Sequence, residues 1–95
     1  MFAKVISRAG EVKITFPENA WAGYLYWQTQ NKKFLKQLNG LIDEVARTPV
    51  AGTGKPEALK HELAGWWSRR ITDEHRLVYR IKDGGLEIAQ CRFHY

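Results

Sequence analysis

Cysteine is almost absent from this 95-residue chain, and it has no long apolar run. The single Cys91 has no partner for an internal disulfide, which excludes a disulfide-stabilised scaffold and fits a reducing compartment. No apolar stretch approaches the roughly 20 residues of a membrane-spanning helix, and the first residues are too polar for a secretory signal. We therefore expect a soluble, cytoplasmic protein with no membrane partner.

The sequence also lacks the motifs of several enzyme classes. The glycine-containing stretch 52–55 does not have the spacing of a Walker phosphate-binding loop. His61, His75 and His94 lie far apart in the sequence, and one cysteine does not complete a structural zinc site. The Gly-x-Ser-x-Gly motif of serine hydrolases is missing as well. We expect neither a metal nor a cofactor.

The composition that remains is that of a small folded domain. Hydrophobic residues make up 44% of the chain, which suffices for one core and is too much for a disordered chain. We expect a single domain over residues 1–95, in which residues 1–11 show no clear period and form an N-terminal extension. The net charge of +5 predicts attraction to polyanions, namely nucleic acid, an acidic protein or an anionic membrane.

Hydrophobic periodicity in the first half predicts one strand and two helices. Apolar and polar residues alternate over 12–16, which indicates a strand. Apolar residues at helical spacing predict a helix over 18–30 and a second helix that ends before Pro49. A tight turn near Asn31 would make the two helices antiparallel.

The second half of the chain predicts a sheet. Strands are expected at roughly 59–63, 66–72, 75–82 and 86–94. The residues around Asp83-Gly84 are typical of a β-hairpin turn between the last two strands. The predicted fold is α+β: an antiparallel sheet with two N-terminal helices packed on one face.

Acid–base and cationic side chains concentrate in this second half. They are Glu57, Lys60, His61, Arg69, Arg70, Arg76, Arg92, His94 and Tyr95. A metal-free ribonuclease needs a base for the ribose 2′-hydroxyl, an acid for the departing 5′-oxygen and cations for the charge of the transition state. Each residue also has a structural alternative, because loop glutamates and arginines on strands are commonly solvated and chain ends commonly fray.

Other residues are better explained by packing. We interpret His61 and His75 as structural. For the pair Trp66-Trp67, core packing is favoured over an exposed platform that stacks on a base.

Several segments together resemble YoeB-type toxins of the RelE/ParE superfamily. They are residues 24–28, 47–49, 52–61, 63–72, 74–79 and 89–95, and the resemblance covers about residues 12–95 without gaps. It implies a fold like that of RelE and the microbial ribonucleases. It further implies a type II toxin that cleaves messenger RNA in the ribosomal A site, next to 16S rRNA, and that an acidic YefM-type antitoxin inhibits.

The resemblance also implies roles for individual residues. Glu57 stands at the position of the general base and His94 at that of the general acid. Arg76 matches the arginine that stabilises the transition-state phosphate, and Tyr95 matches the tyrosine that orients the scissile nucleotide. Lys60 and Arg70 match cations that support the substrate backbone. Two departures from the family are the added residues 1–11 and Ala58, where a proline is common.

Two other function classes remain open at this point. One is a ParE-like toxin that acts by binding a protein target, and the other is an RNA-binding module without turnover. A homodimer is also compatible with the aromatic content.

Strand pairing raises a geometric condition for the implied site. A two-residue turn at 83–84 would place Arg76 opposite Cys91, and His94 would then lie on the other sheet face. We therefore predict a different loop length, a bulge, or a chain that leaves the ladder before Tyr95.

Overall fold

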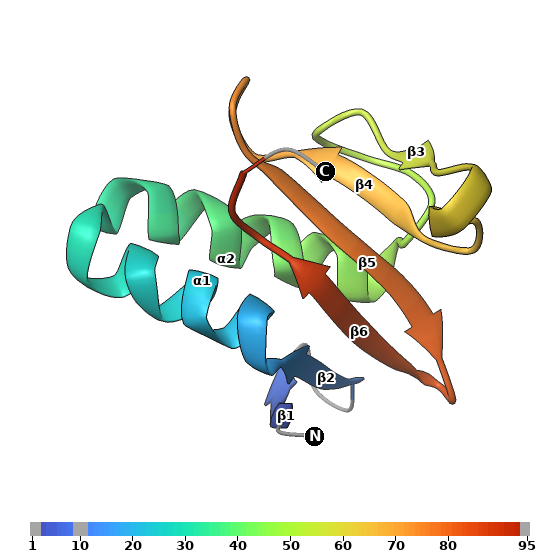
Figure 1. Ribbon diagram of the computed structural model, residues 1–95, viewed down its shortest axis with the longest axis horizontal. Helices are drawn as coiled ribbons and strands as arrows, with labels where there is room; N and C mark the ends of the chain where they lie inside the picture. The colour runs from blue at the N-terminus through green and yellow to red at the C-terminus, as the bar shows by residue number, and fades with distance from the viewer. Residues whose placement is uncertain (1–2, 9–11, 94–95) are drawn as a thin grey trace.

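Two helices cover one face of a six-stranded sheet in the computed structural model, which describes residues 3–8 and 12–93 (Figure 1). The elements are β1 (Ala3–Arg8), β2 (Val12–Pro17), α1 (Glu18–Gln30), α2 (Lys32–Arg47), β3 (Glu57–Ala58), the short 3₁₀ helix η1 (His61–Leu63), β4 (Trp67–Arg70), β5 (Arg76–Lys82) and β6 (Gly85–Gln90). This arrangement confirms the predicted α+β class. No helix in the described part of the chain is long and apolar enough to cross a membrane.

The helices begin and end where the sequence predicts. α1 buries four residues at helical spacing, Ala20, Gly23, Tyr24 and Trp27, and α2 buries Phe34, Leu38, Leu41, Ile42 and Val45. Asn31 separates the two helices: its backbone N–H donates to the Trp27 carbonyl, and its side chain accepts from the Phe34 N–H at 3.0 Å. This N-cap satisfies an otherwise unpaired donor of α2 and confirms the predicted turn.

The sheet has the strand order β1-β2-β6-β5-β4-β3. Neighbouring strands are antiparallel except for β2 and β6, which are parallel and pair Ile14 with Leu86. The prediction of a wholly antiparallel sheet was wrong at this pair. β2 and β6 are joined through the helices and the rest of the sheet, and alternating polarity within a strand does not indicate a partner so distant in the sequence.

The described part of the N-terminal extension forms a strand. β1 pairs antiparallel with β2 over its whole length, from Ala3 opposite Pro17 to Arg8 opposite Val12. Residues 3–8 therefore extend the sheet at its edge.

The expected strand over 59–63 was wrong. Residues 61–63 form η1, which begins at His61 with a φ of 57° and closes with hydrogen bonds from Leu63 to Lys60 and from Ala64 to His61. The left-handed backbone at His61 is incompatible with a strand, so pairing is confined to the two residues of β3.

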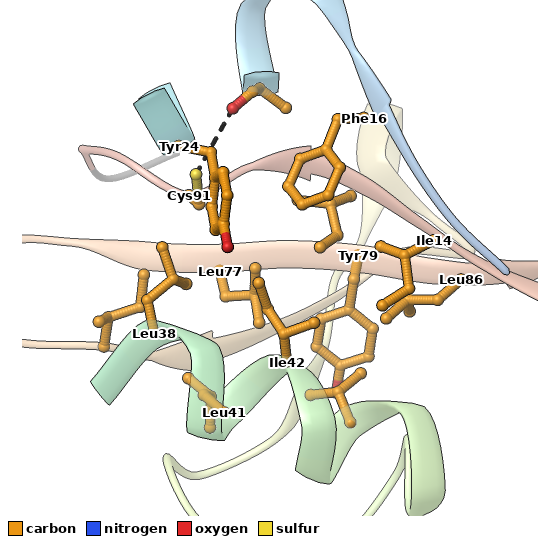
Figure 2. Packing of buried hydrophobic residues seen from close by; sticks show 14 of the residues in the cluster. Ile14, Phe16, Tyr24, Leu38, Leu41, Ile42, Leu77, Tyr79, Leu86 and Cys91 are labelled. Carbon is orange, nitrogen blue, oxygen red and sulfur yellow. Dashed lines mark hydrogen bonds between the residues drawn. The ribbon is translucent and has the colours of Figure 1, made fainter. Parts of the chain in front are cut away.

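The core lies between the helices and the sheet. Figure 2 shows Leu38 and Ile42 of α2 facing Leu77 and Tyr79 of β5. At one end of this layer the Cys91 thiol approaches the Ala20 carbonyl at 3.6 Å, the contact drawn as a dashed line in Figure 2.

Candidate active site

Three of the predicted site residues, Glu57, Arg70 and Arg76, share the sheet face opposite the helices. Residues opposite each other on neighbouring strands point to the same side, and Glu57, Ser68, Val78 and Gln90 form such a row. Val78 is 2% exposed yet lies outside the core cluster that contains its neighbours Leu77 and Tyr79. We call this side, with Glu57, Ser68, Arg70, Arg76, Val78 and Gln90, the open face.

Arg70 and Arg76 form the next row of the open face, because they are directly paired and each lies two residues from the first row. The Arg70 guanidinium lies 3.8 Å from the Asp73 carboxylate, and both side chains are exposed. The Arg76 Nη1 donates to the carbonyls of Thr72 at 2.6 Å and Asp73 at 3.0 Å. Two cations are thus held side by side at the β4–β5 turn.

Glu57 has an exposed side chain and follows a loop over 49–56 that contains two glycines and two prolines. This loop is fastened to the sheet where Gly54 accepts a hydrogen bond of 2.7 Å from the Arg70 N–H. Because β3 begins three residues later, the loop anchor and the pairing of Glu57 with Ser68 together fix the backbone that carries the carboxylate. Lys60 is exposed at the start of η1, beyond the end of the β3–β4 ladder.

Arg69 does not belong to the cationic group in which the sequence placed it. Its side chain is 0% exposed and lies under the loop, where it donates to Glu44 and to the carbonyls of Thr48, Ala51 and Thr53. The Glu44 carboxylate also accepts from the Thr53 N–H at 2.6 Å, and this hydrogen bond, more than the nearby guanidinium, lowers the pKa of Glu44. One signal could have revealed this role: Arg69 alternates with Trp67 and Ile71 on the side of the sheet that faces the core.

The chain leaves the β5–β6 ladder just before its last residues, as the geometric condition requires. The register shifts between Val78 and Tyr79, so Val78 pairs with Gln90 and Tyr79 pairs with Ile88. β6 ends at Gln90, and the carbonyl of Phe93 accepts from the Arg76 N–H at 3.0 Å. Both a bulge and a departure from the ladder are therefore present.

His94 and Tyr95 lie outside the described residues. The residue that precedes them, Phe93, is hydrogen-bonded through its carbonyl to Arg76 and through its N–H to His75. The Phe93 N–H donates to the His75 Nδ1 at 2.7 Å. The sequence interpretation of His75 as structural did not include this contact, since it joins residues 18 positions apart.

The two neighbouring tryptophans have different surroundings. Trp67 packs against the core, as expected. Trp66 is half-buried with the Arg80 guanidinium 4.3 Å from its ring centre, and Arg80 is also paired with Glu87 at 2.9 Å. Within residues 3–8 and 12–93, no group of three or more potential ligand side chains could hold a metal ion.

Comparisons with known proteins agree on one family. The model for a YoeB-like toxin of bacterial type II toxin-antitoxin systems matches residues 16–95. Toxin YoeB of Escherichia coli (strain K12) is 55% identical over 84 residues, which cover 88% of this chain and 100% of that protein. Toxin YoeB of Synechocystis sp. is 56% identical over 84 residues, covering 88% and 98% of the two chains.

Solved structures show the same relationship. The YoeB–YefM complex from Staphylococcus aureus contains a chain with a TM-score of 0.82 and 45% identity, covering 90% of this chain and 100% of that chain. YafQ from E. coli strain BL21(DE3) has a TM-score of 0.72 at 15% identity over 88% of this chain and 94% of its own, and therefore shares the fold alone. The matched residues 16–95 contain every candidate site residue.

Proposed function

Since the chain belongs to the family of YoeB-like toxins of bacterial type II toxin-antitoxin systems, we propose that it is a metal-free endoribonuclease that cleaves messenger RNA in the ribosomal A site. One observation carries the proposal. Glu57, Arg70 and Arg76 share the open face, and the Arg76 N–H holds the carbonyl of Phe93, the residue bonded to His94.

In the proposed reaction, Glu57, His94 and Tyr95 each have a separate role. Glu57 removes the proton of a ribose 2′-hydroxyl, whose oxygen attacks the adjacent phosphorus. His94 donates a proton to the 5′-oxygen as its bond to phosphorus breaks, and Tyr95 orients the scissile nucleotide. The products are a 2′,3′-cyclic phosphate, which water opens to a 3′-phosphate, and a 5′-hydroxyl. Each proton transfer typically contributes about 10²–10⁴ in rate.

Cationic side chains would stabilise the negative charge that develops on the phosphate. Arg76 carries five N–H donors, and its contacts to Thr72 and Asp73 both come from Nη1. These contacts aim the guanidinium while Nε and Nη2 remain suited to phosphate oxygens. We assign Arg70 and Lys60, both exposed, to the substrate backbone.

We also assign residues 1–95 to a single toxin domain, with residues 1–11 as an extension, and place it in the cytoplasm. Its proposed partners are the ribosome and an acidic antitoxin. The S. aureus relative is known both as a YoeB–YefM complex and as a YoeB dimer. A net charge of +5 predicts that antitoxin and ribosome affinities fall steeply as salt rises from about 50 to 200 mM. A flat salt response would argue against electrostatic recruitment.

The test is primer extension on a translated message with parental protein, Glu57→Gln and His94→Ala. Both variants should bind ribosomes like the parent and lose cleavage by about 10²-fold or more. Glu62→Gln is the matched control, because Glu62 is also an exposed glutamate but lies in η1.

Primer extension, combined with a growth assay of the same variants, separates the alternatives. Cuts that depend on translation and disappear in both variants support the proposal. If both variants cleave as fast as the parental protein, the catalytic assignment is wrong. Growth inhibition by the two variants without any cleavage would favour a toxin that acts by binding a protein target.

A further inference from the structure

The backbone of Phe93 is held from both sides. Its N–H donates to the His75 Nδ1 at 2.7 Å, and its carbonyl accepts from the Arg76 N–H at 3.0 Å and from the Gln90 Nε2 at 3.1 Å. Phe93 has a φ of 67°, a left-handed conformation that residues other than glycine rarely adopt. The Phe93 side chain is exposed, although its ring lies near His75 and Arg92, and the three backbone hydrogen bonds stabilise this strained conformation.

His75 is itself held firmly. Its ring meets Trp27 of α1 and Phe34 of α2 edge-on, at centroid distances of 4.9 and 5.4 Å. A backbone N–H only donates, so the Nδ1 that receives the Phe93 N–H must be unprotonated. Burial lowers the pKa of His75, which favours this neutral form. The imidazole thus connects both helices to the segment that leads to His94.

We propose that His75 is a positioning residue for the reaction: by accepting the Phe93 N–H it anchors the residue to which His94, the proposed general acid, is covalently bonded. This inference rests on the proposed function of His94 as general acid. Misplacing a reacting group by about 1 Å can cost about 10²-fold in rate. Because the Arg76 N–H holds the carbonyl of the same residue, both backbone groups of Phe93 are tied to the neighbouring residues His75 and Arg76.

Two substitutions separate the hydrogen bond from the packing. His75→Phe keeps a ring against Trp27 and Phe34 but removes the acceptor. His75→Asn loses the ring but offers an amide oxygen near the position of Nδ1. His61→Asn is the control, since it removes an exposed imidazole outside the site. Cleavage on programmed ribosomes is measured as kcat and KM separately, with folding checked by circular dichroism.

For His75→Phe we expect kcat to fall about 10- to 100-fold with KM nearly unchanged. His75→Asn should recover most of the lost kcat, whereas a purely structural residue would not be rescued by an acceptor on a smaller side chain. The inference is overturned if His75→Phe has the same kcat as the parental protein, or if kcat falls equally in His75→Phe and His75→Asn. If His94→Ala in the same assay is fully active, the proposed function fails instead.

A measurement on the parental protein tests the inference without any variant or activity. Nitrogen chemical shifts of His75 at pH 7.5 should show a proton on Nε2 and none on Nδ1, and the Phe93 amide should exchange slowly with solvent. A proton on Nδ1, or a freely exchanging Phe93 amide, overturns the inference even if every variant folds poorly.

Discussion

The buried guanidinium of Arg69 lies 3.3 Å from the carboxylate of Glu44, and together they hold the loop that precedes Glu57. Arg69 comes from β4 and Glu44 from α2, so the pair ties the sheet to a helix as well as to the loop. A buried charge needs such a set of partners, because removing one leaves the others desolvated and unpaired. The loop that presents the proposed base therefore depends on an ion pair beneath it.

Replacing Arg69 should destabilise the protein strongly. We expect Arg69→Met to lower the free energy of unfolding by about 3–5 kcal/mol, because Glu44 and the loop carbonyls lose their donor. Urea denaturation measures this loss. The matched control is Arg80→Met, which breaks the more exposed pair with Glu87 and should cost about 1 kcal/mol or less. Equal losses in the two variants would contradict the anchoring role of Arg69.

Replacing two glycines by alanine should have opposite effects on the stability of the protein. Gly54 has a φ of 87°, and a Cβ there would lie 2.9 Å from the Arg70 carbonyl oxygen, so Gly54→Ala should destabilise the protein by about 1–3 kcal/mol and reduce cleavage. Gly40 lies within α2 with nothing within 4 Å of the added Cβ. Gly40→Ala should stabilise by about 0.5–1 kcal/mol and leave cleavage unchanged. Thermal melts and primer extension check both expectations.

Acid should weaken the fold through His75. Burial, reinforced by Arg92 and opposed by Glu74, puts its pKa below the ordinary 6.5. As the pH falls below about 6.5, the unfolded chain therefore takes up a proton before the folded chain does, and stability is lost until the folded pKa is passed. The melting temperature should drop between pH 7 and pH 5, and the drop should be smaller in His75→Phe. An identical drop in that variant would show that other groups cause it.

Cys91 should be inert in the folded protein. Its side chain is 1% exposed, and burial raises the pKa of its thiol from 9.0 to about 12. Since the thiolate is the reactive form, alkylation by iodoacetamide at pH 8 should be about 10³-fold slower than in urea. Mass spectrometry follows the reaction over time. Rapid labelling without denaturant would mean that the segment after β6 opens readily.

The helices and the paired strands of the hairpin were predictable because their signals are local. Helical spacing over 18–30, the Asn31 cap and the Asp83-Gly84 turn each involve residues within a few positions of one another. The parallel β2–β6 pair is not local, and alternation within one strand does not reveal it. The 3₁₀ turn at His61 is local, but its left-handed backbone conformation overrides the pattern of side chains.

The sequence indicated some residues of the candidate site and missed others. Residue types and family resemblance pointed to Glu57, Arg70 and Arg76, and strand alternation required an irregularity before the chain end. The arginines were grouped by residue type, which did not separate buried Arg69 from exposed Arg70, although Arg69 alternates with Trp67 and Ile71 on the side that faces the core. The contact from His75 to Phe93 was also missed, because a hydrogen bond between residues 18 positions apart produces no periodic pattern in the sequence.

β6 is the last strand among the described residues, yet it lies inside the sheet between β2 and β5. Without it, the β1–β2 ribbon and the three strands β3 to β5 would be two separate pieces, each with a bare row of amides and carbonyls. Such edges recruit strands from other molecules. A polypeptide cut short before Gly85 is thus expected to aggregate rather than to persist as a smaller folded protein.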